Sequence, residues 1–233
     1  MTAFFIFIKV EKSIIITAGG IGKRMGGSLP KQFLPINNKP LLFYTIECFY
    51  EYDQQIEILL TLPEDWRLYW QELCTEYKFT IHHQVISGGK ERYHSIQLAL
   101  KHSTGKYVGV HDGVRPFVSK QTIVRCFESA INHGSGVPVL PIKESLRKIT
   151  DDKLSVSVER SQYRSVQTPQ VFERSILVNA YERPFHDAIT DDASLVEENG
   201  TTISLVEGNE ENIKITTPLD LAFGEWILSQ KEI

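Results

Sequence analysis

The sequence predicts an α/β fold in which helices flank a mostly parallel β-sheet. The first observation is an alternation, up to about residue 140, of short apolar runs with stretches of helical periodicity, which is typical of βαβ units. The second is size and composition: 233 residues, 42% hydrophobic and 23% charged, suffice for one domain with a buried core. We therefore expect a single domain over residues 13–233, preceded by an extension over residues 1–12.

Strands are predicted where a run of apolar, often β-branched residues ends in a turn signal such as Gly or Asp-Gly. They are expected at Ser13–Thr17, Ile56–Leu62, Thr80–Ile86, Tyr107–His111, Val137–Pro141 and Thr202–Glu207. Because amphipathic stretches separate most of these runs, the strands are expected to pair mostly in parallel.

Helices are predicted where apolar residues recur at helical spacing. They are expected at Pro40–Tyr50, Trp66–Tyr77 and Ser119–Asn132, around Ile96–Leu100, from Arg174, from Asp192 to Asn199, and after Pro218. Ser119 is expected to cap its helix, because a serine hydroxyl can accept a hydrogen bond from a free N–H of the first turn. That helix should turn four residues toward the core: Ile123, Cys126, Phe127 and Ile131.

The segment Ile142–Arg164 has a different texture, that of a β-hairpin. Apolar and polar residues alternate on both sides of Asp151-Asp152-Lys153, which is a turn sequence. A hairpin of this size is too small to be stable alone, so it needs something to pack against. A partner subunit is one candidate, and we call this segment the β-arm.

Charge and cysteine content exclude several classes of protein. The net charge of −4 gives no reason to expect a nucleic-acid surface or a polybasic membrane anchor. The apolar start of the chain is broken by charges and is much shorter than the ~20 residues of a membrane span. Three cysteines without metal-ligand spacing favour a reduced, cytoplasmic protein.

The first candidate site is the glycine-rich segment Ala18-Gly19-Gly20-Ile21-Gly22-Lys23-Arg24, directly after the first predicted strand. Glycines let backbone N–H groups approach phosphate oxygens, and the two cations supply charge. The segment matches neither the P-loop nor the dinucleotide-binding pattern. A tight turn with surface lysines is the alternative, but Lys31 follows closely and could fold back over the same phosphates.

The second candidate is Asp112 with Arg115, at the end of a predicted strand. In open α/β sheets, ligands bind at the carboxyl ends of the strands, so Asp112 should lie near the first loop. Its carboxylate could hold Mg²⁺ or a sugar hydroxyl, and Arg115 could grip a phosphate. The alternative is a turn with a local Asp–Arg ion pair. His111 is expected to be a packed strand residue.

Further candidates are weaker when each is taken alone. Gly88 and Gly89 form a turn before a helix, where backbone groups could read a base edge together with Ser95. Asp191 or Asp192 could simply cap a helix, and Arg160 could be a surface charge of the hairpin. Lys214 lies in an apolar, strand-like run, where an unpaired ammonium group would be costly.

Several motifs occur together and in one order. They are Ala18-Gly19-Gly20-x-Gly22-x-Arg24-Met25, Pro30-Lys31-Gln32, Gly89-x-Glu91-Arg92-x-x-Ser95, His111-Asp112-x-x-Arg115-Pro116, Thr168-Pro169-Gln170, Thr190-Asp191-Asp192-Ala193 and Asn212-Ile213-Lys214-x-Thr216. The set resembles the cytidylyltransferases that act on 2-C-methyl-D-erythritol 4-phosphate in the non-mevalonate route to isoprenoids. The resemblance runs from about Ile14 to Leu228, and Gly19 stands where that family has a second Ala.

The resemblance implies a Rossmann-like nucleotide-diphosphosugar transferase fold and a reaction between CTP and the sugar phosphate, with Mg²⁺ or another divalent cation. The cation would be held mainly by the CTP phosphates, with Asp112 as a further candidate ligand. Arg24, Lys31, Arg160 and Lys214 would be catalytic. The CTP site would comprise Ala18, Gly19, Gly20, Gly22, Lys23, Gly88, Gly89 and Ser95, and the sugar-phosphate site would comprise Asp112, Arg115 and Thr168.

The resemblance also implies a homodimer whose β-arm clasps the neighbouring subunit, which would bring Arg160 close to the partner's site. Two alternatives stay open at this point. A D-ribitol-5-phosphate cytidylyltransferase shares the fold, the CTP site and much of the motif set. A non-catalytic binding protein of the same fold is the other, although the charged residues of the motifs are all present.

Overall fold

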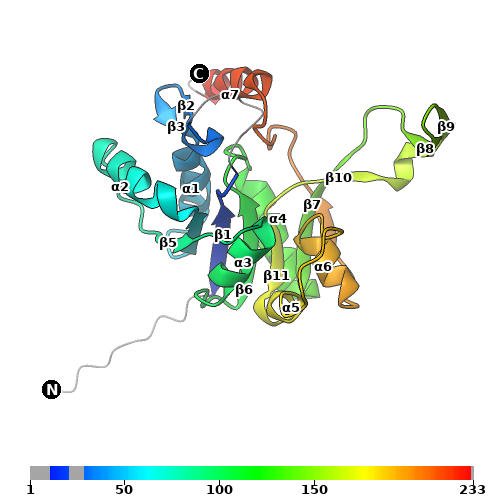
Figure 1. Ribbon diagram of the computed structural model, residues 1–233, viewed down its shortest axis with the longest axis horizontal. Helices are drawn as coiled ribbons and strands as arrows, with labels where there is room; N and C mark the ends of the chain where they lie inside the picture. Colours follow the sequence, from blue (N-terminus) through cyan, green and yellow to red (C-terminus); the bar gives the residue numbers. More distant parts are fainter. Residues whose placement is uncertain (1–10, 21–28, 232–233) are drawn as a thin grey trace.

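The computed structural model describes residues 11–20 and 29–231 (Figure 1). Most of the predicted extension over residues 1–12 therefore lies outside the described residues, as do Gly22, Lys23 and Arg24 of the first loop. The described strands are β1 (Lys12–Thr17), β2 (Pro35–Ile36), β3 (Lys39–Pro40), β4 (Glu57–Leu62), β5 (Gln84–Ser87), β6 (Tyr107–Asp112), β7 (Ser135–Pro141), β8 (Arg147–Asp151), β9 (Leu154–Ser157), β10 (Arg164–Val166), β11 (Gln170–Glu173) and β12 (Leu205–Glu207).

The helices are α1 (Leu41–Tyr52), α2 (Arg67–Glu76), α3 (Arg92–Leu100), α4 (Lys120–His133), α5 (Arg174–Ala180), α6 (Asp192–Glu198) and α7 (Pro218–Lys231). Short 3-10 helices are η2 (Lys31–Phe33), η3 (Glu64–Trp66) and η4 (Arg160–Gln162). Within the described part of the chain, none of these helices is long and apolar enough to cross a bilayer.

The central sheet has the strand order β10-β7-β11-β6-β1-β4-β5. Strand β12 belongs to the same sheet and pairs with β7, but it lies off this path. Four pairs are parallel: β1 with β4, β1 with β6, β4 with β5, and β7 with β12. This confirms the predicted mostly parallel sheet. The chain turns one way from β1 to β4 and the other way to β6, so the strand order reverses at β1. In such sheets the reversal opens a crevice at the carboxyl ends of the strands.

The sequence prediction missed β11 and β10, which are antiparallel. Strand β11 lies between β6 and β7 and pairs antiparallel with both, while β10 pairs antiparallel with β7. They have four and three residues, which is too short to produce a periodic signal. Strand β11 brings the segment that follows Thr168 beside β6, and this matters for the site.

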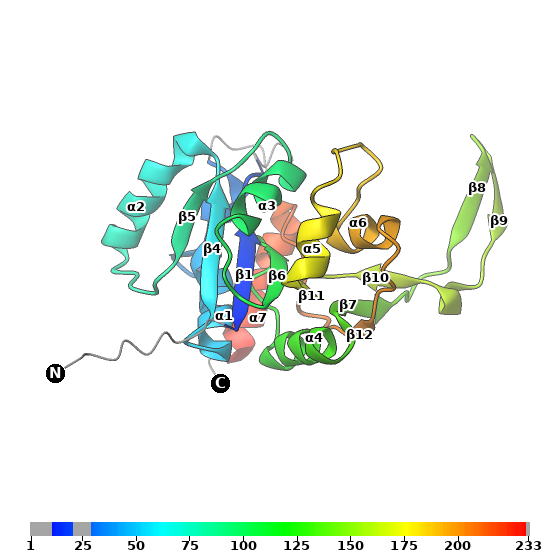
Figure 2. The ribbon, with the colours of Figure 1, turned by 90° about the horizontal axis from the view of Figure 1, so that it is seen from below.

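Alternating side chains of β1 build two cores, one on each face of the sheet. Ile14 and Ile16 pack with α1, α2 and α4, whereas Ile15 packs with α3, α5 and α6. Figure 2 shows α3, α5 and α6 on one side of the sheet and α1 and α4 on the other. All three isoleucines are fully buried, as expected for a strand covered on both faces.

Helix α4 begins as predicted but differs at one inward position. Ser119 accepts a hydrogen bond from the backbone N–H of Thr122 at 3.1 Å, which confirms the cap. The prediction that Ile131 faces inward is wrong, because this side chain is 46% exposed and Ala130 is buried in its place. One residue corresponds to about 100° around a helix, so the buried stripe that continues at Ala130 leaves Ile131 outside it.

Two predicted strands are shorter in the structure than in the sequence analysis. The strand expected at Thr80–Ile86 begins at Gln84, and the strand expected at Thr202–Glu207 begins at Leu205. Both are outer strands whose described pairing is with one neighbour each, β4 and β7. The extent of an outer strand depends on where its neighbour offers backbone partners, and that is a property of the fold.

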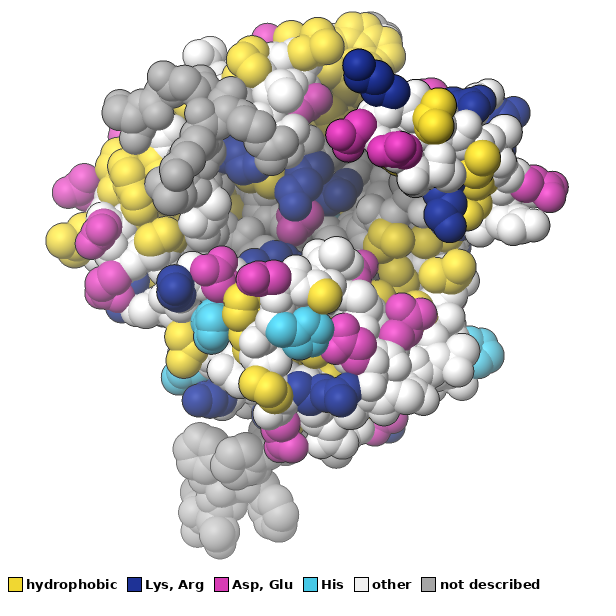
Figure 3. All heavy atoms as spheres, turned by 45° about the vertical axis from the view of Figure 1, so that its right-hand side comes forward, with side chains coloured by type: hydrophobic (Ala, Val, Ile, Leu, Met, Phe, Trp, Pro, Cys, Tyr) yellow, Lys and Arg dark blue, Asp and Glu magenta, His cyan; other side chains and the backbone are white. Residues whose placement is uncertain are grey.

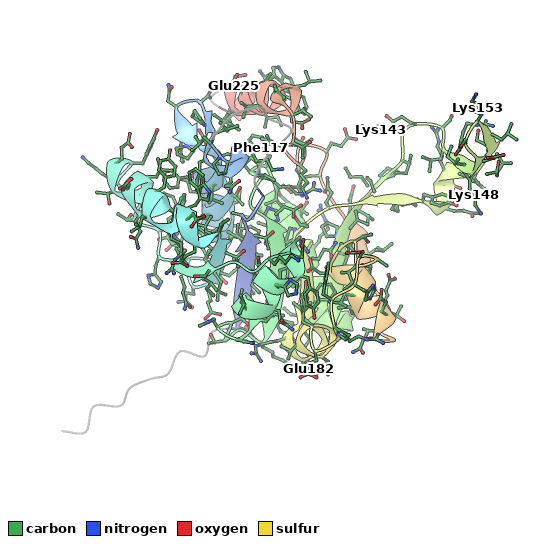
Figure 4. The ribbon with its side chains drawn as sticks, in the orientation of Figure 1. Phe117, Lys143, Lys148, Lys153, Glu182 and Glu225 are labelled. Carbon is green, nitrogen blue, oxygen red and sulfur yellow. The ribbon has the colours of Figure 1, made fainter. Side chains whose placement is uncertain are left out.

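The β-arm stands away from the body of the molecule (Figure 1). Strands β8 and β9 pair antiparallel, with Lys148 opposite Val156, which confirms the predicted hairpin. Figure 4 shows Lys148 and Lys153 at the far end of the arm and Lys143 nearer the body. Apolar side chains on this hairpin are unusually exposed, with Ile149 at 70% and Leu154 at 64%.

Candidate active site

Three loops meet at one edge of the sheet because their strands run parallel. The register places Thr17, the last residue of β1, beside Asp112, the last residue of β6. The backbone N–H of Gly113 donates to the carbonyl oxygen of Thr17 at 2.8 Å, and the N–H of Gly88 donates to that of Leu62 at 2.7 Å. The loops after β1, β5 and β6 thus surround the crevice at the reversal of strand order.

A cleft of about 390 Å³ opens between these loops. Its lining includes the following residues predicted for the site: Ala18, Gly19, Gly20, Lys31, Gly89, Ser95, Asp112 and Lys214. In Figure 3, Lys and Arg side chains gather in the hollow of this face around an acidic side chain. Residues far apart in the sequence therefore form one site, which we call the nucleotide cleft.

Lys31 lies over the glycine-rich loop. A Cβ atom added to Gly20 would lie 3.8 Å from Cε of Lys31, and one added to Gly19 would have no described atom within 4 Å. The buried side chain of Gln32 donates to the carbonyl oxygen of Ala18 at 2.7 Å and so ties η2 to the loop. The open surroundings of Gly19 leave room for the Ala that the resembling family has there.

The Gly88-Gly89 turn is held by Ser95 of α3. The backbone N–H of Gly89 donates to Oγ of Ser95 at 3.0 Å, and Oγ in turn donates to the carbonyl oxygen of Glu91 at 3.2 Å. A side chain on Gly89 would place its Cβ 2.4 Å from Cβ of His94, so the turn requires glycine. Ser95 therefore shapes the turn that lines the cleft.

Three cations surround the carboxylate of Asp112. Oδ2 lies 3.2 Å from Nε of Arg115 and 3.0 Å from Nζ of Lys214, and Oδ1 lies 3.7 Å from Nε of Arg92. Burial alone would raise the pKa of Asp112, but Arg92, Lys214 and Arg115 outweigh it and hold the pKa well below its usual range. Asp112 is therefore an anion at any working pH.

The structure corrects the surroundings predicted for Lys214. Residues 212–216 form no regular strand, and the Lys214 side chain is 44% exposed and paired with Asp112. The local pair predicted between Asp112 and Arg115 is present, and it is one part of this larger cluster.

A second hollow of about 330 Å³ adjoins the nucleotide cleft. Arg92, Asp112 and Lys214 line both spaces and form the wall between them. The second hollow is also lined by Arg115 and Thr168, so it brings together the residues predicted for the sugar phosphate. We call it the acceptor hollow. Two adjoining spaces with a cationic wall between them suit two anionic substrates that react with each other.

Thr168 and His111 form a hydrogen-bonded support beneath Asp112. Nε2 of His111 faces the carbonyl oxygen of Arg115 at 3.0 Å, and a carbonyl oxygen can only accept, so Nε2 carries the proton. Nδ1 then accepts from the hydroxyl of Thr168 at 3.0 Å, while this hydroxyl oxygen accepts from the backbone N–H of Asp112 at 3.1 Å. His111 is fully buried, as the prediction of a packed strand residue requires.

The sequence analysis missed the contribution of Arg92 and Asp192. Nη1 and Nη2 of Arg92 donate to the two carboxylate oxygens of Asp192 at 3.1 and 2.7 Å. Asp191 caps α6: its side chain accepts from the backbone N–H of Ser194, and the Ser194 hydroxyl accepts from the backbone N–H of Asp191. Asp192, the next residue, is fully buried. Both acidic residues occur in the quoted motif, but only the fold shows that one caps α6 and the other pairs with an arginine 100 positions away.

Arg160 lies apart from both hollows in its own chain. It belongs to η4 in the β-arm, is exposed, and donates from Nη1 to the carbonyl oxygen of Lys143. Neither the nucleotide cleft nor the acceptor hollow includes Arg160 among its described lining residues.

Comparisons with known proteins agree on one family. The model of the 2-C-methyl-D-erythritol 4-phosphate cytidylyltransferase family matches residues 13–230. A protein of that name from Bacteroides thetaiotaomicron is 49% identical over 94% of this chain and all of its own length. The structure of such an enzyme from Thermus thermophilus has a TM-score of 0.77 at 32% identity, over 94% of this chain and all of that one. The structure of 4-diphosphocytidyl-2C-methyl-D-erythritol synthase from Anaerococcus prevotii has a TM-score of 0.81 at 26% identity, over 95% of this chain and 99% of that one.

The buried, neutral His111 should make stability depend on pH. Burial lowers the pKa of His111 to about 4, whereas an unfolded histidine titrates near 6.5. Between these values the unfolded chain binds a proton that the folded chain does not, so stability is complete above about pH 6.5 and falls toward pH 4. From pH 7.5 to pH 5, the free energy of unfolding should fall by about 2 kcal/mol more in the wild type than in His111→Gln.

Denaturant titrations at the two pH values measure this difference. His133→Gln, at an exposed histidine at the end of α4, is measured in parallel to show how much the same substitution changes the pH dependence at another histidine. Equal pH dependence in the wild type and His111→Gln would contradict the prediction.

Proposed function

The chain belongs to the 2-C-methyl-D-erythritol 4-phosphate cytidylyltransferase family, and on that premise we propose how its two hollows carry out the reaction. The enzyme transfers the cytidylyl group of CTP to 2-C-methyl-D-erythritol 4-phosphate. An oxygen of the sugar phosphate forms a bond to the α-phosphorus of CTP, while the bond from this phosphorus to the bridging oxygen of the β-phosphate breaks. The products are 4-diphosphocytidyl-2-C-methyl-D-erythritol and pyrophosphate.

The observation that carries the proposal is the wall shared by the two hollows. If CTP occupies the nucleotide cleft and the sugar phosphate occupies the acceptor hollow, their phosphates meet where Asp112 and Lys214 line both spaces. Holding two anions there in line for attack converts an encounter in solution into a reaction within one complex. No covalent intermediate with the protein is needed.

The nucleotide cleft supplies backbone groups and positive charge. Gly19 and Gly20 allow the backbone of the first loop to approach the triphosphate closely. Lys31 lies over that loop and would stabilise the charge that builds up on the α-phosphate and on the leaving pyrophosphate. Arg24, which lies outside the described residues, would share this role, as the family resemblance implies.

The glycine turn after β5 would face the base. Gly89 lines the cleft, whereas Gly88, directly before it, is not among the lining residues, and Ser95 acts by holding the turn through its hydroxyl. Because both hydrogen bonds of this hydroxyl go to the turn, we assign Ser95 a positioning role in the recognition of cytosine and ribose.

The acceptor hollow supplies cations for the phosphate and an anion for the hydroxyl groups. Lys214 is 44% exposed and can turn toward a phosphate, and Arg115 offers further donors. Asp112 is permanently ionised and can accept hydrogen bonds from the sugar hydroxyls. Thr168 fixes the backbone of Asp112 from below.

The divalent cation would arrive with the nucleotide, as part of the substrate. The described residues contain no group of three or more His, Cys, Asp or Glu side chains able to hold a metal ion. Both oxygens of Asp112 already face cations, and such a carboxylate is a poor ligand for Mg²⁺. We therefore propose that phosphate oxygens of CTP hold the cation and that Asp112 does not.

The β-arm would join two copies of the chain. Exposed Ile149, Leu154 and Val156 on a free-standing hairpin suit a contact with another subunit. A homodimer would also give Arg160 a role, because it could reach the acceptor hollow of the partner rather than that of its own chain. This proposal explains why a residue to which the family resemblance assigns a catalytic role lies outside both hollows.

We also propose that the protein is located in the cytoplasm. The three cysteines all lie in the described part of the chain, and none of them forms a disulfide there. Burial raises the pKa of Cys74 to about 11 and that of Cys126 to about 12, so neither is a reactive thiolate near neutral pH. Such cysteines suit a reducing compartment.

The choice of acceptor can be tested by pyrophosphate release. With CTP and Mg²⁺ present, we expect kcat/KM to be roughly 10²-fold or more higher with 2-C-methyl-D-erythritol 4-phosphate than with D-ribitol 5-phosphate, because a site built for one set of hydroxyls leaves polar groups unpaired with another. CTP alone gives the background rate. A preference for ribitol phosphate would overturn the assignment, and background release with both acceptors would favour a non-catalytic protein.

The proposed exchange of Arg160 between subunits can be tested by complementation. Lys31→Ala should lower kcat by roughly 10²–10³ while CTP still binds, because it removes charge stabilisation in the transition state. Arg160→Ala should also lose most activity. When the two variants are mixed and allowed to exchange subunits, half of the sites in a mixed dimer would be intact, so part of the activity should return.

Each variant mixed with wild-type protein serves as the control for subunit exchange. Mass spectrometry or differently tagged subunits would show whether heterodimers form. If heterodimers form and no activity returns, Arg160 acts within its own chain.

A further inference from the structure

The guanidinium group of Arg92 bridges two carboxylates that come from distant parts of the chain. Its two terminal nitrogens contact Asp192 at the start of α6, and its Nε lies 3.7 Å from Oδ1 of Asp112 at the end of β6. Arg92 is itself the first residue of α3, directly after the turn that lines the nucleotide cleft. One side chain thus connects the nucleotide cleft, the shared wall and the helix beside the acceptor hollow.

We propose that Arg92 is a positioning residue that orients the carboxylate of Asp112 toward the acceptor through its bidentate contact with Asp192. The proposal rests on the proposed function of the acceptor hollow. It adds a residue that acts through another, since the nitrogens of Arg92 described above already face carboxylates of the protein.

The two oxygens of Asp112 are held differently, and this difference leaves one of them open to a ligand. Oδ2 receives close contacts from Arg115 and Lys214, whereas the 3.7 Å between Oδ1 and Arg92 is longer than an N–H···O hydrogen bond. At that distance Arg92 attracts Oδ1 electrostatically and leaves room for a donor to approach. A hydroxyl group of the acceptor is the donor that this oxygen fits.

The far end of the bridge is rigid. Asp192 is fully buried, and the hydroxyl group of Tyr181 donates to its Oδ1 at 2.5 Å. Burial alone would lower the pKa of Arg92, but Asp192 and Asp112 more than compensate, so the guanidinium stays charged. Because an arginine fork pairs with a carboxylate in one planar geometry, the position of Asp192 fixes the direction of Nε.

A simple structural tie between α3 and α6 would produce the same contacts, so the test must separate the two roles. A structural tie would affect thermal stability and leave the kinetic constants of the folded enzyme unchanged. A positioning role would raise the KM for the acceptor much more than the KM for CTP, because Asp112 faces the acceptor.

The first test compares Arg92→Lys with the wild type in steady-state kinetics with CTP and 2-C-methyl-D-erythritol 4-phosphate. A lysine keeps the positive charge, but its single ammonium group cannot span both Asp192 and Asp112. We expect the KM for the acceptor to rise by roughly 10–100-fold, the scale of a small misplacement in a site, and the KM for CTP to change by less than about 3-fold.

The matched control is Arg183→Lys. Arg183 is an exposed arginine whose guanidinium donates to the carbonyl oxygen of Glu198 at the other end of α6, away from Asp112. The same chemical change there should leave both KM values as in the wild type.

Tyr181→Phe provides a second variant in case Arg92→Lys does not fold. It removes the hydroxyl group that supports Asp192 and keeps the ring, so a smaller rise of the acceptor KM, of a few-fold, is expected, again with little change for CTP.

Two outcomes would overturn the positioning role. One is an unchanged KM for the acceptor in Arg92→Lys, whether or not the melting temperature falls, and the other is an equal rise of both KM values. Failure of the proposed function is distinguishable, because wild-type protein would then show no turnover with this acceptor before any variant is compared.

Discussion

The arrangement of the site depends on one buried carboxylate, that of Asp112. Arg92, Arg115 and Lys214 come from α3, the loop after β6 and the segment after β12, and without an anion between them these cations would repel one another at short range. Asp112 converts that repulsion into a cluster with two excess positive charges, or one when Asp192 is also counted. A protein with a net charge of −4 can thus present a cationic wall to phosphates, because the mean charge of a chain does not describe one crevice.

The sheet determines where this carboxylate stands. Parallel pairing of β1 with β6 brings the glycine-rich loop and Asp112 to the same edge, and the reversal of strand order opens the crevice between them. Thr168 lies just before the antiparallel strand β11, which pairs with β6, and so the Thr168 hydroxyl comes beside the backbone N–H of Asp112 and accepts a hydrogen bond from it. The nucleotide cleft therefore follows from the parallel half of the sheet, and the acceptor hollow follows from the antiparallel insertion beside it.

The parts of the site that lie directly after strong strands could be predicted from the sequence. Gly20 and Asp112 each follow an apolar run that can hardly be anything but a buried strand, so their common edge follows from parallel pairing. The pairing of Arg92 with Asp192 could not be predicted, because a charged residue in the first turn of a helix is usually exposed and the two positions are 100 residues apart. The sequence indicates that Lys214 is unusual, because it lies in an apolar run, but its partner depends on a segment without regular secondary structure. Short β11 gives no periodic signal, and its place depends on long-range contacts.

The most direct test of this account is to remove the charge of Asp112 and keep its shape. In Asp112→Asn, the three cations lose their internal counterion, so the account predicts that inorganic phosphate, measured by calorimetric titration, binds at least as tightly as to the wild type. Turnover should nevertheless fall by roughly 10²-fold or more, because the acceptor loses its oriented hydrogen-bond partner. Weaker phosphate binding together with wild-type turnover would contradict the central claim that Asp112 organises the cationic wall.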